Sequence, residues 1–338
     1  MSRWLWTTRP GFEEDLAEEL TRAGRHVTPF GPALVETDVP PPDAKWPVFA
    51  RAGCALIDEL DADADGVAKA LAKALTPTTG TKIRSWTLQA WVPDADFTNP
   101  LAADADALAA AAQKRLETLR PELALRRVDD AAAAHRLDGM LAQVVMVAPR
   151  RAVVGILPAA QPPTLAPGGR ARTAAPKTAP SRAARKLGEA FAWIGRTPEA
   201  GDRCVDLGAA PGGWTAVLLE HRAKVIAVDP AKLEPQLASN KNLAHVMASA
   251  FDFAPDAPVD WLLCDMAWRP VEVAQLLAKW GRRRWASTLV ANIKLPMKQR
   301  VDFVEKVLET VAEGGWQGVR GRQLYHDREE ITISAWRT

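Results

Sequence analysis

VDLGAAPGGWT, residues 205–215, is the stretch that decides the fold of this chain. It has the pattern of the end of a buried strand, a tight glycine-bearing loop and the first turn of a helix. In an open α/β sheet, a nucleotide-like cofactor binds at such a strand–loop–helix junction. The stretch therefore predicts a Rossmann-like domain whose ligand lies beside this loop.

The loop also indicates which kind of cofactor binds. Its spacing is Asp-x-Gly-x-x-Pro-Gly-Gly, with Asp206 at the strand end, rather than Gly-x-Gly-x-x-Gly. A pyrophosphate prefers bare backbone amides with no anion nearby, whereas a positively charged cofactor favours a carboxylate there. S-adenosylmethionine fits this description and NAD does not. The residues expected to contact the cofactor here are Asp206, Gly208, Ala210, Pro211, Gly212, Gly213 and Trp214.

Length and composition indicate a globular protein with two domains. The chain has 338 residues, of which 48% are hydrophobic and 25% charged. The net charge is only +2, so a surface that binds nucleic acid must be basic locally. The three cysteines are far apart and no histidine cluster has metal-ligand spacing, so we expect reduced thiols, no metal and a cytoplasmic protein. We find no signal peptide and no apolar run of about 18 residues, which argues against a membrane span.

A proline-rich segment, residues 158–180, is the best boundary in the chain. It contains six prolines, and the longer window from Gly139 to Gly188 contains no Asp or Glu. Such a basic window is either a solvated linker or a surface that follows a phosphate backbone. The part before it mixes strands and helices without a glycine fingerprint, which is typical of a binding region rather than a catalytic one.

Beyond residue 180, apolar runs alternate with helical patterns. This alternation predicts right-handed crossovers and a mostly parallel sheet. The last two runs are close enough in sequence to pair antiparallel. We therefore expect a mostly parallel sheet with an antiparallel last strand. The expected strands are Cys204–Leu207, Lys224–Val228, Trp261–Cys264, Leu289–Ile293, Val319–Tyr325 and Ile331–Trp336.

Polar residues follow several of these runs, where the carboxyl ends of the strands form a ligand crevice. Asp229 ends the second strand, where a carboxylate can accept hydrogen bonds from both ribose hydroxyls of an adenosine. Taken alone, an aspartate at a strand end is more often a turn former or a helix cap. Ser249 falls where the adenine edge would be met. Asp265 and Lys294 should project into the same crevice.

Lys294 is the candidate general base. It lies among apolar residues beside a proline, and burial together with a second cation, Lys186, would lower its pKa. The competing interpretation is an ordinary surface lysine. Glu329 and Glu330 precede the last strand, and either carboxylate could be the partner of the lysines. We favour Glu330 because it is adjacent to the strand.

Together these motifs resemble the ribosomal-RNA 2′-O-ribose methyltransferases that use a Lys-Asp-Lys-Glu tetrad, and most closely those that modify a cytidine of 23S rRNA. The catalytic half matches throughout, and the last three motifs are specific. The matching motifs are residues 9–13 (RPGFE), 179–182 (APSR), 206–215 (DLGAAPGGWT), 264–266 (CDM), 294–298 (KLPMK) and 323–330 (QLYHDREE).

The resemblance implies a tetrad of Lys186, Asp265, Lys294 and Glu330, with Lys294 as the base, and Asp265 is also expected to contact the methionine end of S-adenosylmethionine. It further implies a small ferredoxin-like domain at 1–50, a THUMP-like RNA-binding domain at 51–157, the linker at 158–180 and the Rossmann-like methyltransferase domain at 181–338. The expected partner is 23S rRNA or its precursor particle. The residues expected to guide the RNA are Arg182, Arg185, Lys298, Arg300, Arg322 and Arg328.

Two alternatives remain open at this point. One is 2′-O-methylation of a different RNA, either tRNA or another rRNA position. The other is a non-catalytic RNA-binding or ribosome-assembly factor that retains only the fold. The complete lysine–aspartate–lysine–glutamate set favours an enzyme, because a pure binding protein needs no such constellation. The sequence does not indicate the oligomeric state.

Overall fold

The computed structural model contains two compact units, Met1–Ala171 (unit 1) and Arg172–Thr338 (unit 2). The structure describes residues 3–39, 46–76, 83–96, 98–177 and 179–337. The division falls inside the segment 158–180 predicted as a linker, of which residue 178 lies outside the described residues. Part of that segment packs within unit 1, where Gly169 lies directly against the backbone of Arg51. No helix among the described residues is long and apolar enough to cross a membrane.

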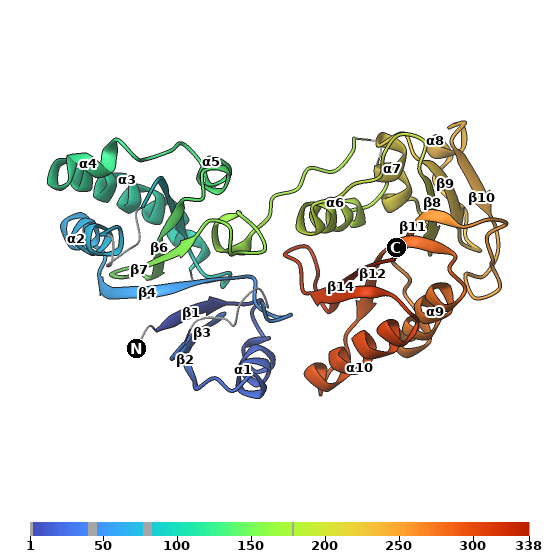
Figure 1. Ribbon diagram of the computed structural model, residues 1–338, viewed down its shortest axis with the longest axis horizontal. Helices are drawn as coiled ribbons and strands as arrows, with labels where there is room; N and C mark the ends of the chain where they lie inside the picture. Colours follow the sequence, from blue (N-terminus) through green and yellow to red (C-terminus); the bar gives the residue numbers. More distant parts are fainter. Residues whose placement is uncertain (1–2, 40–45, 77–82, 97, 178, 338) are drawn as a thin grey trace. The chain divides into compact units, whose positions relative to one another are not determined.

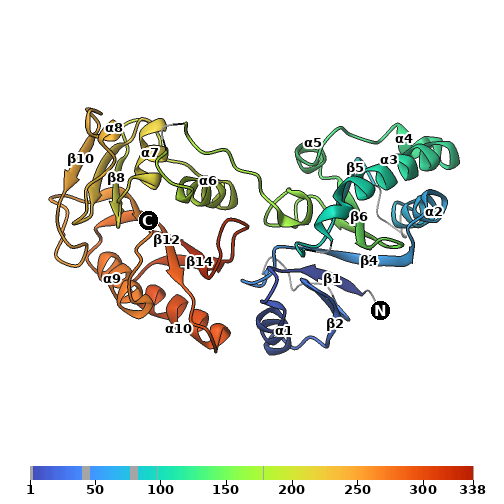
Figure 2. The same ribbon diagram turned by 180° about the vertical axis from the view of Figure 1, so that it is seen from behind.

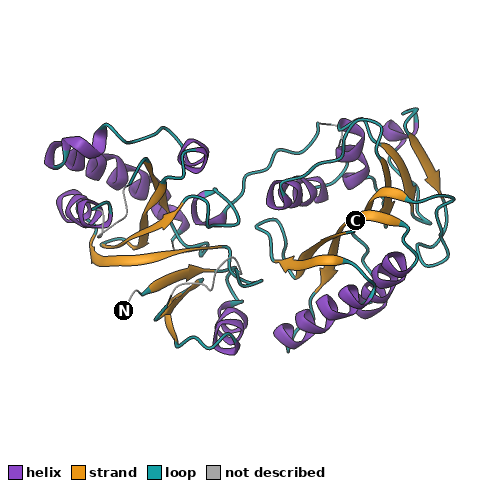
Figure 3. Ribbon diagram, viewed as in Figure 1, coloured by secondary structure: helices purple, strands orange, loops and turns teal. Residues whose placement is uncertain are grey.

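Unit 1 is an α+β fold on one seven-stranded sheet (Figure 3). Its strands are β1 (Trp4–Thr7), β2 (Val27–Gly31), β3 (Leu34–Thr37), β4 (Ala52–Asp61), β5 (Trp86–Trp91), β6 (Met140–Ala148) and β7 (Arg151–Pro158). Its helices are α1 (Glu13–Arg22), α2 (Ala64–Ala74), α3 (Ala102–Leu119), α4 (Pro121–Ala124) and α5 (Ala131–Arg136), with short 3₁₀ turns η1 (Asn99–Leu101) and η2 (Pro167–Gly169).

The sheet of unit 1 has the strand order β2-β3-β1-β4-β7-β6-β5. Strand β4 pairs with both β1 and β7, so one sheet runs across the expected boundary between residues 50 and 51. Helices α2 and α3 supply the core beside it. The alanine-rich α3 buries Ala105, Ala109, Ala112 and Leu116, whose spacing of three or four residues places them on one helix face.

Unit 2 is the α/β half of the chain (Figure 1). Its strands are β8 (Arg203–Leu207), β9 (Lys224–Val228), β10 (Leu243–Val246), β11 (Val259–Cys264), β12 (Ala286–Lys294), β13 (Gln317–Arg322) and β14 (Glu330–Trp336). Its helices are α6 (Ala183–Ile194), α7 (Gly213–Glu220), α8 (Pro235–Ala238), α9 (Pro270–Arg282) and α10 (Arg300–Glu313).

The sheet of unit 2 has the order β10-β9-β8-β11-β12-β14-β13. The first five strands are parallel, and β14 runs antiparallel to both β12 and β13. This confirms the expected mostly parallel sheet with an antiparallel last strand. Figures 1 and 2 show α6 and α7 on one side of the sheet and α9 and α10 on the other. Buried strands between two helical layers account for the nearly continuous apolar runs in the sequence.

The direction of strand order reverses at β8. From there the chain first builds outward through β9 and β10, then returns to place β11 and β12 on the other side of β8. In open α/β sheets, ligands bind at the carboxyl ends of the strands beside such a reversal. The loop after β8 and the residue after β11, Asp265, therefore lie at the expected crevice.

Candidate active site

Strand pairing between β12 and β14 places the candidate catalytic residues opposite one another. Lys294 is the cross-strand partner of Glu330, and Asn292 is the partner of Thr332. Because side chains alternate along a strand, residues two apart share a face of the sheet. Directly opposed side chains on one face lie close enough to interact. The four side chains therefore form one polar group at the end of the sheet.

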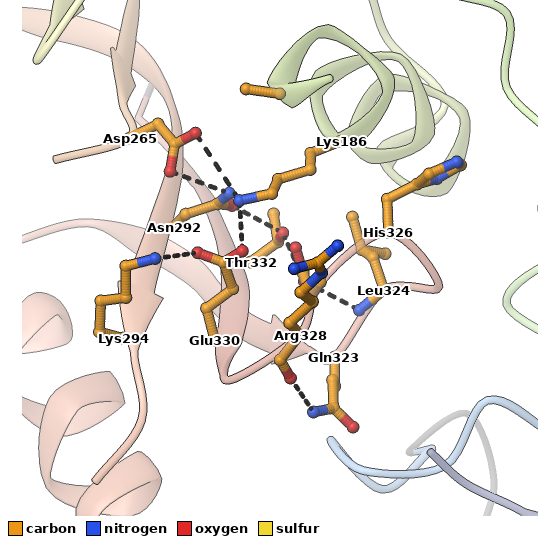
Figure 4. A network of polar contacts seen from close by, with 12 residues as sticks. Lys186, Asp265, Asn292, Lys294, Gln323, Leu324, His326, Arg328, Glu330 and Thr332 are labelled. Atoms are coloured by element: carbon orange, nitrogen blue, oxygen red, sulfur yellow. Dashed lines mark hydrogen bonds and ion pairs between the residues drawn. The ribbon is translucent and has the colours of Figure 1, made fainter. Parts of the chain in front are cut away.

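The four residues predicted as a tetrad meet in one network (Figure 4). The Glu330 carboxylate accepts a hydrogen bond from Lys294 Nζ at 3.2 Å through Oε2, and its Oε1 forms an ion pair with Lys186 Nζ. Lys186 Nζ also lies 3.8 Å from Asp265 Oδ2. One carboxylate thus holds both amines, and Lys186 connects the two acids.

Burial differs between the two lysines. The Lys186 side chain is 16% exposed and that of Lys294 is 48% exposed. Burial lowers the pKa of Lys186, but the negative charges of Asp265 and Glu330 more than offset this, and its pKa lies above the ordinary value. Burial raises the pKa of Glu330, but the two lysines outweigh it, and its pKa lies below the ordinary value. The network therefore keeps Lys186 protonated and Glu330 ionised, and leaves Lys294 as the amine that faces solvent.

A second row of polar groups supports the tetrad. Asn292 Nδ2 donates a hydrogen bond to Asp265 Oδ1 at 3.3 Å. The Thr332 hydroxyl lies 2.8 Å from Asn292 Oδ1 and 3.0 Å from Asp327 Oδ2. Burial raises the pKa of Asp327 well above its ordinary value. Asn292 and Thr332 were not among the predicted site residues, although each lies two positions from a tetrad residue on its own strand.

The two candidate glutamates separate clearly. Glu330 is buried between the lysines, whereas Glu329 is exposed and lies 3.5 Å from Arg300 Nη2. The reason is the alternation of side chains at the start of β14, which sends neighbouring residues to opposite sides. Only Glu330 contacts the network.

The predicted cofactor loop follows β8. Asp206 is 1% exposed, and its Oδ2 accepts a hydrogen bond from the Thr215 hydroxyl at 2.7 Å. Its other oxygen, Oδ1, is buried and has no hydrogen-bond partner among the described residues. Burial raises the pKa of Asp206 to about 7. A buried acid with an unused acceptor suits a ligand that brings a positive charge or a donor, so the loop fits the predicted S-adenosylmethionine.

Glycines let the loop pass close to its neighbours. Gly208 has φ +76°, and a Cβ there would lie 2.7 Å from Met266 Cγ. A Cβ on Gly213 would lie 2.2 Å from the Ser181 hydroxyl oxygen. The glycine spacing read from the sequence therefore serves packing as well as access to a ligand. Pro211 is exposed at the tip of the loop, where it is free to contact a ligand.

Asp229 and Ser249 follow β9 and β10, at the same edge of the sheet as the loop after β8. Asp229 Oδ2 accepts a hydrogen bond from the Ala210 amide at 3.1 Å, and its Oδ1 accepts one from the Ala231 amide at 2.8 Å. Ser249 follows β10 and accepts a hydrogen bond from the Phe251 amide at 3.2 Å. Both side chains are partly exposed, so they retain surface that a ligand can reach.

Two expectations are corrected by burial. The Trp214 side chain is 3% exposed and its indole donates to the Ala183 carbonyl at 3.0 Å, so it anchors α7 to α6 and only its backbone can face a cofactor. Arg322, expected to guide RNA, is 5% exposed, so its side chain is not on the surface where RNA would approach. Among the described residues, no group of His, Cys, Asp or Glu is arranged to hold a metal ion.

Relatives of known name match this chain across both units. A family model described as FtsJ-like methyltransferase matches residues 179–309. The ribosomal RNA large subunit methyltransferase M of Halorhodospira halophila (strain DSM 244 / SL1) is 36% identical over 350 residues, which cover 99% of this chain and 96% of that protein. The protein of the same name from Alkalilimnicola ehrlichii (strain ATCC BAA-1101 / DSM 17681 / MLHE-1) is 35% identical over 363 residues, covering 99% and 95%.

Proposed function

We propose, since this chain belongs to the ribosomal RNA large subunit methyltransferase M family, that it transfers a methyl group from S-adenosylmethionine to the 2′-hydroxyl of a cytidine in 23S rRNA. The resemblance predicted from the motifs is confirmed, and so is the expected enzyme class. The observation that carries the proposed chemistry is a single buried carboxylate, Glu330, that holds two lysines of unequal exposure.

Lys294 is the proposed general base. To accept a proton from an alcohol, an amine must reach the substrate and must be able to exist unprotonated. Lys294 has the more exposed amine of the two lysines and a fixed direction, because Glu330 Oε2 lies 3.2 Å from its Nζ. Lys186 is unsuited to this step because its pKa is raised.

The other tetrad residues position the reacting groups and balance their charges. Lys186 stays protonated between Asp265 and Glu330, and places a fixed positive charge beside the site where the ribose oxygen becomes negative. Asn292 orients Asp265 through its 3.3 Å hydrogen bond. A prepositioned network of this kind needs little rearrangement during the reaction, which is where its contribution to the rate arises.

The loop after β8 is the proposed site for S-adenosylmethionine, which supplies the sulfonium methyl group. The residues proposed to hold it are Asp206, Gly208, Ala210, Pro211, Gly212, Gly213, the Trp214 backbone, Asp229, Ser249 and Asp265. Asp206 and Asp265 favour its positive charge, and Asp229 offers oxygens to the ribose. Support comes from the unused buried oxygen of Asp206.

RNA is proposed to approach across the basic side chains around the tetrad. Arg182, Arg185, Lys298 and Arg328 are exposed, and such side chains bind phosphates in a salt-sensitive way. Unit 1 is proposed to contribute two RNA-binding parts that share one sheet, ferredoxin-like over 1–50 and THUMP-like over 51–157. We further propose 23S rRNA or its precursor particle as substrate and the cytoplasm as location, in keeping with three free buried cysteines.

Two substitutions at residue 294 test the base. Lys294→Ala removes the amine, and Lys294→Arg keeps a positive charge beside Glu330 but cannot lose a proton at neutral pH. Both should lower the rate of methyl transfer by about 10²- to 10⁴-fold while binding of RNA and S-adenosylmethionine is retained. Lys306→Ala, at an exposed lysine of α10, is the control.

The outcomes separate the possible roles. Wild-type rates for Lys294→Arg would show that Lys294 acts only as a cation, and the assignment of the base would be wrong. Mapping 2′-O-methyl groups in rRNA from cells that lack the protein identifies the nucleotide. A wild-type protein that binds rRNA but never transfers a methyl group would support the binding-factor alternative.

A further inference from the structure

A hollow of unit 2 lies at the opposite end of the sheet from the tetrad. It has a volume of about 290 Å³ and is lined by residues that include Arg196, Thr288, Arg320, Ser334 and Trp336, together called the sheet-end pocket. Thr288 and Trp336 are cross-strand partners, six positions along β12 from the Lys294–Glu330 pair. At about 3.3 Å per residue this separation is roughly 20 Å. The pocket is therefore too far from the tetrad to hold the reacting nucleotide.

Two arginines of this pocket lie over aromatic rings. The Arg320 guanidinium lies 4.8 Å from the centre of the Trp193 ring, and the Arg196 guanidinium lies 5.8 Å from that of Trp261. Neither guanidinium group makes a hydrogen bond or an ion pair with a described residue. Stacking uses the flat face of a guanidinium and leaves its N–H groups, which lie in the plane, free for an oxyanion.

The pocket contains positive charge without a matching negative charge. None of the described residues that line it is an aspartate or a glutamate. The pKa of Arg320 is lowered, and burial is the only cause, so no neighbouring carboxylate compensates the loss of water. A partly desolvated cation of this kind gains more from an incoming anion than a fully solvated one does.

The remaining walls combine hydroxyl groups with an aromatic surface. Thr288 and Ser334 are 4% and 3% exposed, so these two residues form the buried bottom of the pocket. The Trp336 side chain is 39% exposed. Its indole lies directly over Gly318, where a Cβ would come within 1.9 Å of the ring. Packing on a glycine fixes the ring in place and leaves a surface on which a base can stack.

We propose that the sheet-end pocket binds the rRNA substrate at a segment flanking the methylated nucleotide, with a backbone phosphate between Arg196 and Arg320 and an unpaired base on Trp336. This inference rests on the proposed function, because it assigns a second binding surface to the same RNA. The two guanidinium groups can donate paired hydrogen bonds to a backbone phosphate, and the indole beside them can stack on an unpaired base. These are the two groups that a single-stranded nucleotide presents. An acidic peptide would use the arginines but not the aromatic surface.

The test measures binding of a 23S rRNA fragment to the full chain by fluorescence anisotropy at several salt concentrations. For the double variant Arg196→Gln/Arg320→Gln we expect Kd to rise about tenfold. The slope of log affinity against log salt should become shallower by about 0.7 for each phosphate that the variant no longer neutralises. Trp336→Leu should raise Kd about fivefold or more without changing that slope, since stacking carries no charge.

The control is Arg282→Gln/Arg283→Gln, which removes the same charge from the exposed end of α9, outside the pocket. It should change Kd less than twofold. In methyl transfer, the pocket variants should raise the KM for RNA and leave kcat and the Kd of S-adenosylmethionine unchanged. If the pocket double variant unfolds, Arg196→Gln alone carries the test, because Arg196 is exposed.

Three results would decide the matter. Equal reductions of affinity in the pocket variant and its control would overturn the proposal, since they would reflect net charge alone. Wild-type affinity and slope in the pocket variant would overturn it as well, and methyl transfer could still proceed as proposed. If the pocket variants weaken RNA binding as expected while the wild type transfers no methyl group, the pocket stands and the proposed function fails.

Discussion

Asp206→Asn should make the stability of unit 2 less sensitive to pH. Asp206 is 1% exposed and burial raises its pKa to about 7. A carboxyl group whose pKa is higher in the folded than in the unfolded chain stabilises the fold below its unfolded pKa. That stability is lost as the pH rises through the folded pKa. Asparagine has nearly the same shape and does not titrate.

The magnitude follows from the two pKa values. The pKa of Asp206 is 3.8 in the unfolded chain and about 7 in the folded one. Between these two pH values the unfolding free energy falls by about 1.36 kcal/mol per pH unit, about 4 kcal/mol in total. From pH 5 to pH 8 the unfolding free energy of the wild type should therefore fall by about 3 kcal/mol relative to the variant. Other titrating groups are shared by both proteins and largely cancel in the difference.

Urea unfolding at pH 5, 6, 7 and 8 measures this difference. The chain has two units, so the transition that belongs to unit 2 is identified as the one that S-adenosylmethionine shifts to higher urea. A difference that stays constant from pH 5 to pH 8 would refute the reasoning, because it would mean that Asp206 has the same pKa in both states. The same ligand should bind the wild type more tightly as the pH rises toward 7, and this trend should be weaker in the variant, in which only Asp265 remains to titrate beside the ligand.

Three further substitutions address the network and the loop. Glu330→Gln should lower the rate of methyl transfer at least 100-fold and the unfolding free energy by about 3 kcal/mol, because the buried Lys186 loses a counter-charge. Rate assays and urea unfolding measure these two effects, and a variant as active as the wild type would exclude a role for that charge. Asn292→Ala should slow methyl transfer about tenfold by leaving Asp265 without its donor, whereas a changed Kd for S-adenosylmethionine in calorimetry would point to a binding role instead. Gly213→Ala should weaken S-adenosylmethionine binding at least tenfold, because a Cβ there would lie 2.2 Å from the Ser181 hydroxyl oxygen. An unchanged affinity in calorimetry would show that the loop can shift without losing affinity for the ligand.

Much of unit 2 could be predicted because its evidence is local in sequence. Each parallel strand is a short apolar run, and a residue that ends such a run lies at the carboxyl edge of the sheet. This rule alone placed Asp206, Asp265 and Lys294 together. The same rule does not place Glu330, because its position depends on the register of β14 against β12. The sequence favoured it over Glu329, but only pairing explains why it meets both lysines.

The parts that could not be predicted depend on contacts between distant residues. Strand β4 pairs with β7 about 90 residues later, and no local pattern indicates that this pairing continues the sheet begun by β1. The burial of Trp214 was missed for a similar reason, because its partner lies on α6. A residue in a ligand-binding loop can serve the core instead, and only the packed structure distinguishes the two roles.

The unequal exposure of the two lysines also determines where the proton goes. Transfer of a methyl group from a sulfonium to a hydroxyl releases one proton for each product molecule. Lys294 has a side chain that is 48% exposed, so a proton taken up there can pass to water without crossing the buried Glu330 and Lys186. Lys294 can return to its starting state while the buried pair keeps its charges. Each turnover would thus acidify a weakly buffered solution by one equivalent, and the buried half of the network would remain ready for the next substrate.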